Sequence, residues 1–275
     1  MIRRPPRSTP KPSSAASDVY KRQLHNNKDF EGMRKAGNLA ASTLDLLVDH
    51  VKPGVSTDEL DYFAFEFITK NGGLIAPLFY KGFPKSICTS INHVICHGIP
   101  SSRILEEGDI VNIDVTVIVD GWHGDTSRMF PVGKINAKAQ KLIDCTFESM
   151  HEGIKAASPK SRLGDIGYAI QSYAEKQNYS VVRDFCGHGL GKVFHEFPNI
   201  LHYGEKNTGD QIEEGMFFTV EPMINVGNYD VRMLKDGWTA VTKDKSLSAQ
   251  FEHSIGITKE GFEIFTKSPA GLDKP

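Results

Sequence analysis

Five side chains of types that commonly bind metal ions stand out along the C-terminal two-thirds of the chain. In chain order they are Asp114, Asp125, His188, Glu221 and Glu252. Each lies in a segment predicted to be a strand or an adjoining turn, and a carboxylate in an apolar strand is costly to bury unless a positive charge neutralises it. Divalent metal ions supply such charge, and carboxylates with one imidazole around a metal pair form a site that activates water for hydrolysis.

The strongest local argument concerns Asp114 and Asp125, which flank a predicted hairpin. Apolar and polar residues alternate before Asp120-Gly121, a dipeptide typical of two-residue hairpin turns. This turn pairs Asp114 with Ser127 and Thr116 with Asp125. The two aspartates then share one face as diagonal neighbours, about 7–8 Å apart. Two solvated aspartates on an exposed hairpin explain this segment alone equally well.

The other candidate ligands have weaker local support. Glu221 ends an apolar run before Pro222, which marks a strand end, and Glu252 lies in a strand-like segment. Each glutamate alone is more often an edge or salt-bridged residue. His188 lies between two glycines, which allow close backbone approach and can aim an imidazole. A lone histidine is more often a hydrogen-bonded core or surface residue, so the metal interpretation depends on all five residues together.

Helices alternate with strands in the elements that must position these residues. Apolar residues recur at three- and four-residue steps over residues 27–50, which predicts a helix that Pro53-Gly54 terminates. Ser56 or Thr57 can cap a second helix over residues 58–71. Further helices are predicted at 137–157 and 163–177, and strands at 87–94, 109–119, 122–130, 251–258 and 262–266.

Two segments of the chain resemble each other, which indicates an internal duplication. Glu-Glu-Gly at residues 106–108 precedes Asp114, and Glu-Glu-Gly at residues 213–215 precedes Glu221, with the same offset of 107 residues. A duplication would place one carboxylate on an equivalent strand of each half. The site would then lie where the two halves meet.

Composition limits the classes of function. The chain has 275 residues, 39% of them hydrophobic and 24% charged, with a net charge of −2, so bulk charge gives no case for binding nucleic acid or a membrane surface. No apolar run approaches the roughly 18–20 residues that cross a bilayer. The four cysteines form no CxxC pair, which argues against a structural zinc finger and fits a reducing cytosol. The sequence therefore predicts a cytoplasmic protein.

The first 23 residues differ from the rest. They are basic, rich in Ser and Pro and without periodicity, which predicts a disordered extension before a single catalytic domain at 24–275. Their prolines oppose the amphipathic helix of a transit peptide. The segment resembles translated adaptor or vector sequence, so we expect the authentic start near Leu24.

Taken together, these segments resemble the type I methionine aminopeptidases from about Asn27 to Thr266. The motifs that carry the resemblance are KSICTSIN (85–92), CHGIP (96–100), NIDVT (112–116), DGWHGDT (120–126), GHGLG (187–191), FHE (194–196), TVEPM (219–223) and QFEH (250–253). The resemblance implies an α+β "pita-bread" fold, in which a curved antiparallel sheet with helices outside is built from two pseudo-two-fold related halves. It implies metal-dependent removal of the N-terminal methionine from nascent proteins and peptides with a small second residue.

The resemblance also implies roles for individual residues. The five candidate ligands would hold two divalent ions, with Asp125 and Glu252 bridging them. Glu221 would also be the general base, and His97 and His195 would contact the substrate around the scissile amide. Oxygen-rich ligation with one imidazole suits Co, Mn, Fe or Zn, so the sequence does not identify the metal.

A methionine pocket and a monovalent cation site follow from the same resemblance. The pocket residues would be Tyr80, Phe83, Cys88, Phe194 and Trp238. A sodium or potassium ion would bind near Asn92, Val94 and Ser248. Two positions depart from the family: Pro77 replaces an expected cysteine, and Phe83 a common tyrosine. Both changes leave the pocket lining uncharged, so we expect methionine preference to persist.

The implied partners are nascent polypeptide N-termini, with a transient ribosome contact, and the implied state is a monomer of the short bacterial or organellar form. An X-Pro aminopeptidase or prolidase is the alternative that shares fold and ligands, but the CHGIP and GHGLG motifs favour the methionine enzymes. A binding module that has lost its metals is the non-enzymatic alternative. Competent residues at all five ligand positions argue against it.

Overall fold

The computed structural model of the protein describes residues 23–274, so the predicted extension lies outside the described residues except for position 23. The helices are α1 (Asn27–Leu47), α2 (Thr57–Lys70), α3 (Ala137–Ala156) and α4 (Leu163–Lys176), with a 3-10 turn at Tyr80–Gly82. The strands of the first half are β1 (Leu74–Ile75), β2 (Cys88–Ile91), β3 (Val94–Cys96), β4 (Ile110–Val119) and β5 (Trp122–Pro131). Those of the second half are β6 (Ser180–Val181), β7 (Gly187–Gly189), β8 (Glu196–Ile200), β9 (Phe217–Val220), β10 (Met223–Asn225), β11 (Val231–Met233), β12 (Ala240–Thr242), β13 (Ser248–Gln250), β14 (Glu252–Thr258) and β15 (Gly261–Ile264).

Local side-chain caps explain where the first two helices begin. Asn26 and Asp29 form a capping box at α1, and Ser56 and Glu59 form one at α2, so the first free backbone N–H groups of each helix are satisfied. All four predicted helices are confirmed. The first ends at Leu47 rather than at residue 50, because the backbone there tightens into bonds three residues apart, such as His50 N–H to Leu47 O (3.0 Å).

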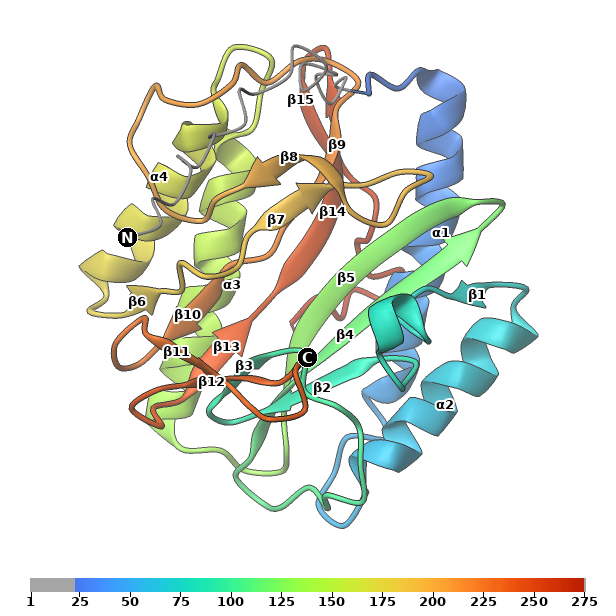
Figure 1. Ribbon diagram of the computed structural model, residues 1–275, viewed down its shortest axis with the longest axis vertical. Coiled ribbons are helices and arrows are strands. Elements are labelled where there is room, and N and C mark those ends of the chain that lie inside the picture. Colours follow the sequence, from blue (N-terminus) through green and yellow to red (C-terminus); the bar gives the residue numbers. More distant parts are fainter. Residues whose placement is uncertain (1–22, 275) are drawn as a thin grey trace, which may run out of the picture.

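The central feature is one large antiparallel sheet that joins the two halves (Figure 1). Its strand order is β1-β4-β5-β14-β9-β7-β8, with β2 also paired to β4 and β15 to β14. The pairing of β5 with β14 therefore connects the first half to the second. Asp120 (φ 51°) and Gly121 (φ 81°) form the tight turn between β4 and β5. The predicted register is confirmed, with Asp114 opposite Ser127 and Thr116 opposite Asp125.

One strand prediction was wrong. The segment 87–94 is two strands rather than one, because the chain turns at Asn92, which has a left-handed backbone (φ 55°). The Asn92 side chain holds this turn: its amide donates to Asp109 Oδ1 (2.7 Å) and its oxygen accepts from Ile110 N–H (3.1 Å). As a result β2 stays in the large sheet, while β3 pairs with β12 in a small sheet.

Each half has its own hydrophobic core between helices and sheet. Helix α1 lies beside β4 and β5 and α2 packs against α1 and β1, whereas α3 and α4 lie beside the strands of the second half (Figure 1). Ile113 and Val115 of β4 are fully buried in the first core with Leu44 of α1. Since side chains alternate along a strand, Asp114 must point to the opposite face of the sheet, away from this core. No helix within residues 23–274 is both long and apolar enough to pass through a membrane.

Candidate metal centre

The five predicted ligands come together around one cavity beside the large sheet. Asp125, His188 and Glu252 each offer a ligand atom within 4.8 Å of the others. His188 Nε2 lies 3.6 Å from Asp125 Oδ2 and 3.7 Å from Glu221 Oε1. Asp114 lines the same cavity. The five residues come from β4, β5, β7, β14 and the end of β9, so the candidate centre spans both halves.

Burial makes this cluster electrostatically unfavourable without a cation. It raises the pKa of Asp114 to about 7, and it raises the pKa values of Asp125, Glu221 and Glu252 well above their usual range. Repulsion between neighbouring carboxylates raises the last three further. Burial also lowers the pKa of His188 to about 4, so its imidazole is neutral near pH 7 and forms no ion pair with the carboxylates.

This donor set fits divalent metal ions. Among residues 23–274, no Lys or Arg side chain forms an ion pair with any of the four carboxylates. A neutral imidazole and carboxylate oxygens are ligands that first-row divalent ions accept. The missing positive charge and the chemistry of the donors therefore point to the same kind of occupant.

Polar neighbours orient the ligands, and the sequence analysis did not assign these neighbours a role. Thr116 Oγ1 donates to Asp125 Oδ1 (2.6 Å), and Thr219 Oγ1 donates to Glu221 Oε1 (2.6 Å). His202, which is buried, accepts a hydrogen bond from the Glu221 backbone N–H (3.2 Å). The strand alternation that predicts the position of Asp114 also places Thr116 on the same face, so the contact of Thr116 with Asp125 could have been predicted from the sequence. No sequence pattern near His202 indicates its contact with Glu221.

Close backbone packing explains the glycines on both sides of His188. A Cβ atom at Gly187 would lie 2.3 Å from the Thr219 carbonyl oxygen, and one at Gly189 would lie 2.3 Å from the Phe197 carbonyl oxygen. Any larger residue would push β7 away from its neighbours. The His188 backbone N–H, in turn, bonds Thr219 Oγ1 (3.0 Å). The glycines thus place the imidazole against the carboxylates of the other strands.

A cavity of about 320 Å³ opens onto the candidate centre. All five predicted pocket residues line it, together with His97, His195, Pro77 and residues that the sequence did not predict, namely Lys81, Thr116, Asp184, Phe185, Cys186 and Met223. Trp238 packs edge-on against Phe83, with ring centroids 5.2 Å apart. Burial and the charge of Asp114 raise the pKa of the Cys88 thiol, which keeps it neutral. The lining away from the carboxylates is thus aromatic and largely uncharged.

His97 and His195 lie on the wall of this cavity. His97 has a left-handed backbone (φ 55°), a conformation that is uncommon for residues other than glycine and often found at functional sites. The His195 ring is 4.1 Å from the His188 ring, and its Nδ1 is hydrogen-bonded to the Tyr80 hydroxyl (3.1 Å). Burial lowers the pKa of His195 to about 3, and the neighbouring His188 and Lys81 side chains contribute to the same shift. Both histidines are therefore neutral near pH 7, because burial lowers the pKa of His97 as well.

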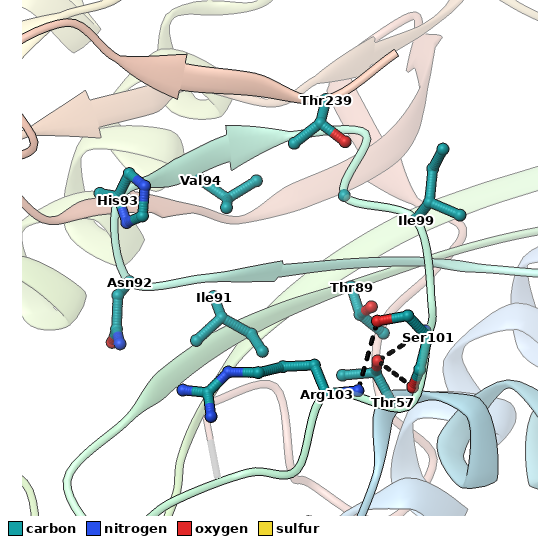
Figure 2. A pocket seen from close by; sticks show the side chains of 11 residues that line it. Thr57, Thr89, Ile91, Asn92, His93, Val94, Ile99, Ser101, Arg103 and Thr239 are labelled. Atoms are coloured by element: carbon teal, nitrogen blue, oxygen red, sulfur yellow. Dashed lines mark hydrogen bonds between the residues drawn. The ribbon is translucent and has the colours of Figure 1, made fainter. Parts of the chain in front are cut away.

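A second cavity, of about 240 Å³, lies beside the turn between β2 and β3 (Figure 2). Asn92 and Val94, two of the three predicted cation-site residues, line it. The third, Ser248, is adjacent in space, since its backbone N–H donates to the Asn92 carbonyl (2.8 Å). Within the described part of the chain, the buried Ser248 hydroxyl has no hydrogen-bond partner. The three residues predicted for the cation are thus neighbours.

With this geometry established, comparison with known proteins identifies the family. The model of metallopeptidase family M24 matches residues 31–259. The chain belongs to metallopeptidase family M24. The M24 match contains all five candidate ligands and both histidines of the cavity.

Similar proteins support this assignment. The methionine aminopeptidase of Rickettsia prowazekii (strain Madrid E) is 63% identical over 254 residues, which cover 92% of this M24 chain and 98% of the relative. The crystal structure of methionine aminopeptidase from Rickettsia prowazekii covers 90% of this chain and 100% of its own, with a TM-score of 0.89. A prolidase from Pyrococcus furiosus, at 21% identity and a TM-score of 0.72, covers 90% of this chain and 66% of its own, and shares the fold alone. The predicted pita-bread fold is confirmed.

Proposed function

We propose that this chain removes the N-terminal methionine from nascent polypeptides and peptides by metal-dependent hydrolysis, when the second residue is small. The observation that carries the proposal is the aromatic, largely uncharged cavity of about 320 Å³ that opens directly onto the carboxylate–histidine cluster. An unbranched apolar side chain suits such a lining, and the scissile bond would then lie at the cluster. The 63% identity to a methionine aminopeptidase supports the same choice of substrate.

In this proposal Asp114, Asp125, His188, Glu221 and Glu252 would hold two divalent ions, Co, Mn, Fe or Zn. Bound there, the ions would polarise the scissile carbonyl and lower the pKa of a water molecule. Glu221 is the general base that takes the proton of the attacking water and passes it to the leaving amine. Thr219 Oγ1, which donates to Glu221 Oε1 (2.6 Å), keeps that carboxylate oriented for the transfer.

His97 and His195 bind the scissile amide. If the Tyr80 hydroxyl donates to His195 Nδ1, the imidazole keeps its proton on Nε2, which becomes a hydrogen-bond donor. Such a donor can stabilise the negative charge that develops on the carbonyl oxygen. Because the pKa of His195 is lowered to about 3, the ring does so as a neutral group.

The remaining assignments concern the surroundings of the enzyme. Asn92, Val94 and Ser248 bind sodium or potassium, and their mutual contacts support this grouping. The protein acts in the cytoplasm as a monomer on chains emerging from the ribosome, with a transient ribosome contact. Its catalytic domain is a single unit that extends over residues 24–275.

Release of free methionine tests the proposal directly. Chelator-treated protein is incubated with Met-Ala-Ser, with Mn, Fe, Co or Zn restored singly, and an X-Pro peptide serves as the control substrate. We expect metal-dependent release from Met-Ala-Ser and none from the X-Pro peptide. Cleavage of the X-Pro peptide instead would indicate a prolidase-type enzyme. Folded protein that cleaves neither peptide with any metal would indicate a binding module.

A further inference from the structure

A turn with an unusual backbone forms one rim of the cavity. Phe79 (φ 65°), Lys81 (φ 48°) and Gly82 (φ 88°) all have left-handed conformations, which residues with a Cβ atom rarely adopt. Such conformations persist where the surrounding structure holds them. Here Phe79 N–H donates to Phe83 O (2.7 Å) and Phe83 N–H donates to Tyr80 O (2.9 Å), so the turn is closed on itself. Its side chains therefore start from a well-defined backbone.

This turn is linked to the substrate-binding wall. Tyr80 stacks on His195 with ring centroids 5.3 Å apart and shares a hydrogen bond with it. Lys81 lines the same cavity, with Nζ 5.2 Å from the centroid of the Tyr80 ring. The Lys81 ammonium therefore lies beside Tyr80 on the cavity wall, and its charge contributes to lowering the pKa of His195.

Lys81 has no counter-charge among the described residues, whereas Lys85 and Lys35 of the same half each have one. Lys85 Nζ lies 2.7 Å from Asp58, and Lys35 Nζ lies 3.7 Å from Asp120. Within residues 23–274, no carboxylate lies within 4.0 Å of Lys81 Nζ. Apart from the candidate ligands and the two histidines His97 and His195, the acidic and basic lining residues of the cavity are Lys81 and Asp184, and both are exposed. Both charges therefore lie where the cavity meets solvent.

We propose that Lys81 is a specificity-determining residue that favours a carboxylate in the substrate just beyond the scissile bond, on the third residue or at the C-terminus of a short peptide. The inference rests on the proposed function, because it requires methionine in the cavity and the rest of the chain at the rim. An unpaired ammonium there attracts an anionic group within a Debye length, about 8–10 Å in ordinary buffer. The fixed turn limits how far the ammonium can move away.

The experiment compares metal-loaded full-length protein on two amidated peptides, Met-Ala-Asp-Leu and Met-Ala-Lys-Leu. The readout is the ratio of their kcat/KM values, because a general loss of activity cancels from it. We expect Lys81→Gln to lower the Asp/Lys ratio about two- to five-fold, as for an exposed charge pair, and Lys81→Glu to lower it further. Added salt should weaken the wild-type preference.

Two matched variants separate a specific charge effect from other causes. Lys81→Arg keeps the charge and should keep the ratio. Lys176→Gln removes one charge at the exposed end of α4, away from the cavity lining, and should leave the ratio unchanged. A ratio that stays the same in both Lys81→Gln and Lys81→Glu overturns the inference while methionine release continues. If no peptide releases methionine, the proposed function fails and the inference fails with it.

Discussion

Two clusters of buried charge in this protein differ in how the cost of burying a carboxylate is offset. The first, which we call the C-terminal clasp, consists of Arg128, Asp45, Ser268 and the carbonyls of Ala41 and Leu272. Arg128 is only 1% exposed, and its guanidinium pairs with Asp45 and donates to Leu272 O (3.1 Å) and Ala41 O (3.2 Å). Ser268 Oγ donates to the same Asp45 carboxylate (2.8 Å). Positive and negative charge are thus both supplied by side chains.

The second cluster is the candidate metal centre, where only the negative charge is supplied. Four carboxylates meet around a histidine whose pKa is lowered to about 4, and the pKa of Asp114 is raised to about 7. In the clasp, burial is offset by a covalently attached cation. In the metal centre, the same cost must be offset either by protons or by ions from solution. Because no side-chain cation balances its negative charge, the candidate metal centre can bind ions from solution and take part in catalysis.

The largest expected effect is on catalysis at the candidate metal centre. Glu221→Ala should lower methionine release from Met-Ala-Ser by about 10²–10⁴-fold or more, because it removes both the proposed base and a ligand. Metal content measured by mass spectrometry on the same sample shows which role dominates. Glu221→Gln, which keeps the shape, is the matched variant. Wild-type turnover in Glu221→Ala would refute the assignment.

The second effect should appear at the C-terminal clasp, and it should change stability without changing activity. Asp45→Ala leaves the buried Arg128 charge unpaired, so we expect the free energy of unfolding to fall by about 3–5 kcal/mol in urea titrations. Methionine release per folded molecule should not change. The double variant Asp45→Leu with Arg128→Met removes both charges and should recover part of that loss. Equal losses in the single and double variants would show that unpaired charge is not the cause.

The third effect concerns protons at the metal centre. Because the carboxyl pKa values are raised in the folded protein, metal binding near pH 6 must displace protons from them. Apparent affinity for Mn should then rise about tenfold per pH unit for each proton released, between pH 5.5 and the pKa of about 7 for Asp114. His188, with its pKa lowered to about 4, does not compete in this window.

Calorimetry in buffers of different ionisation enthalpy measures this proton release. The sign for these four carboxyl groups follows from their raised pKa values: above about pH 4 they hold more protons in the metal-free folded protein than in the unfolded chain, so their ionisation destabilises the fold as pH rises. Asp125→Ala should lose both the metal and the proton release. Metal binding without any proton release at pH 6 would contradict the raised pKa values.

The smallest effect again belongs to the clasp. Ser268→Ala removes one neutral donor to Asp45 but keeps the Arg128 pair, so the free energy of unfolding should fall by about 1 kcal/mol. The same urea titration measures it beside Asp45→Ala. A loss as large as that of Asp45→Ala would mean that the hydroxyl, and not the charge balance, holds the C-terminal segment in place.

Local chemistry explains which features could be predicted from the sequence. Asp120-Gly121 sets the turn and therefore the register that brings Asp114 and Asp125 to one face. Ser56 begins α2 through a contact only three residues away. The candidate ligands could be named because carboxylates in apolar strands conflict with their surroundings unless a cation is present. Each of these inferences uses residues close together in the chain.

Contacts between distant residues could not be predicted in the same way. The break at Asn92 depends on Asp109, 17 residues away, and so the segment looked like one strand. Arg128 pairs with Asp45, which lies 83 residues away in the chain. No sequence pattern around either residue indicates the other as its partner. The sequence around Lys81 predicts an ordinary surface lysine. Its position at the rim of the cavity follows from the turn in the folded protein.

The helices, the hairpin and the types of residue that can bind metal follow from the order of the amino acids. Which charges are balanced depends instead on which strands become neighbours in the folded protein. The pairing of β5 with β14 brings Glu252 beside the aspartates of the first half, where no lysine or arginine within residues 23–274 pairs with it. Electrostatic energy depends on distance in space and on burial, and neither is a property of a residue's position in the chain.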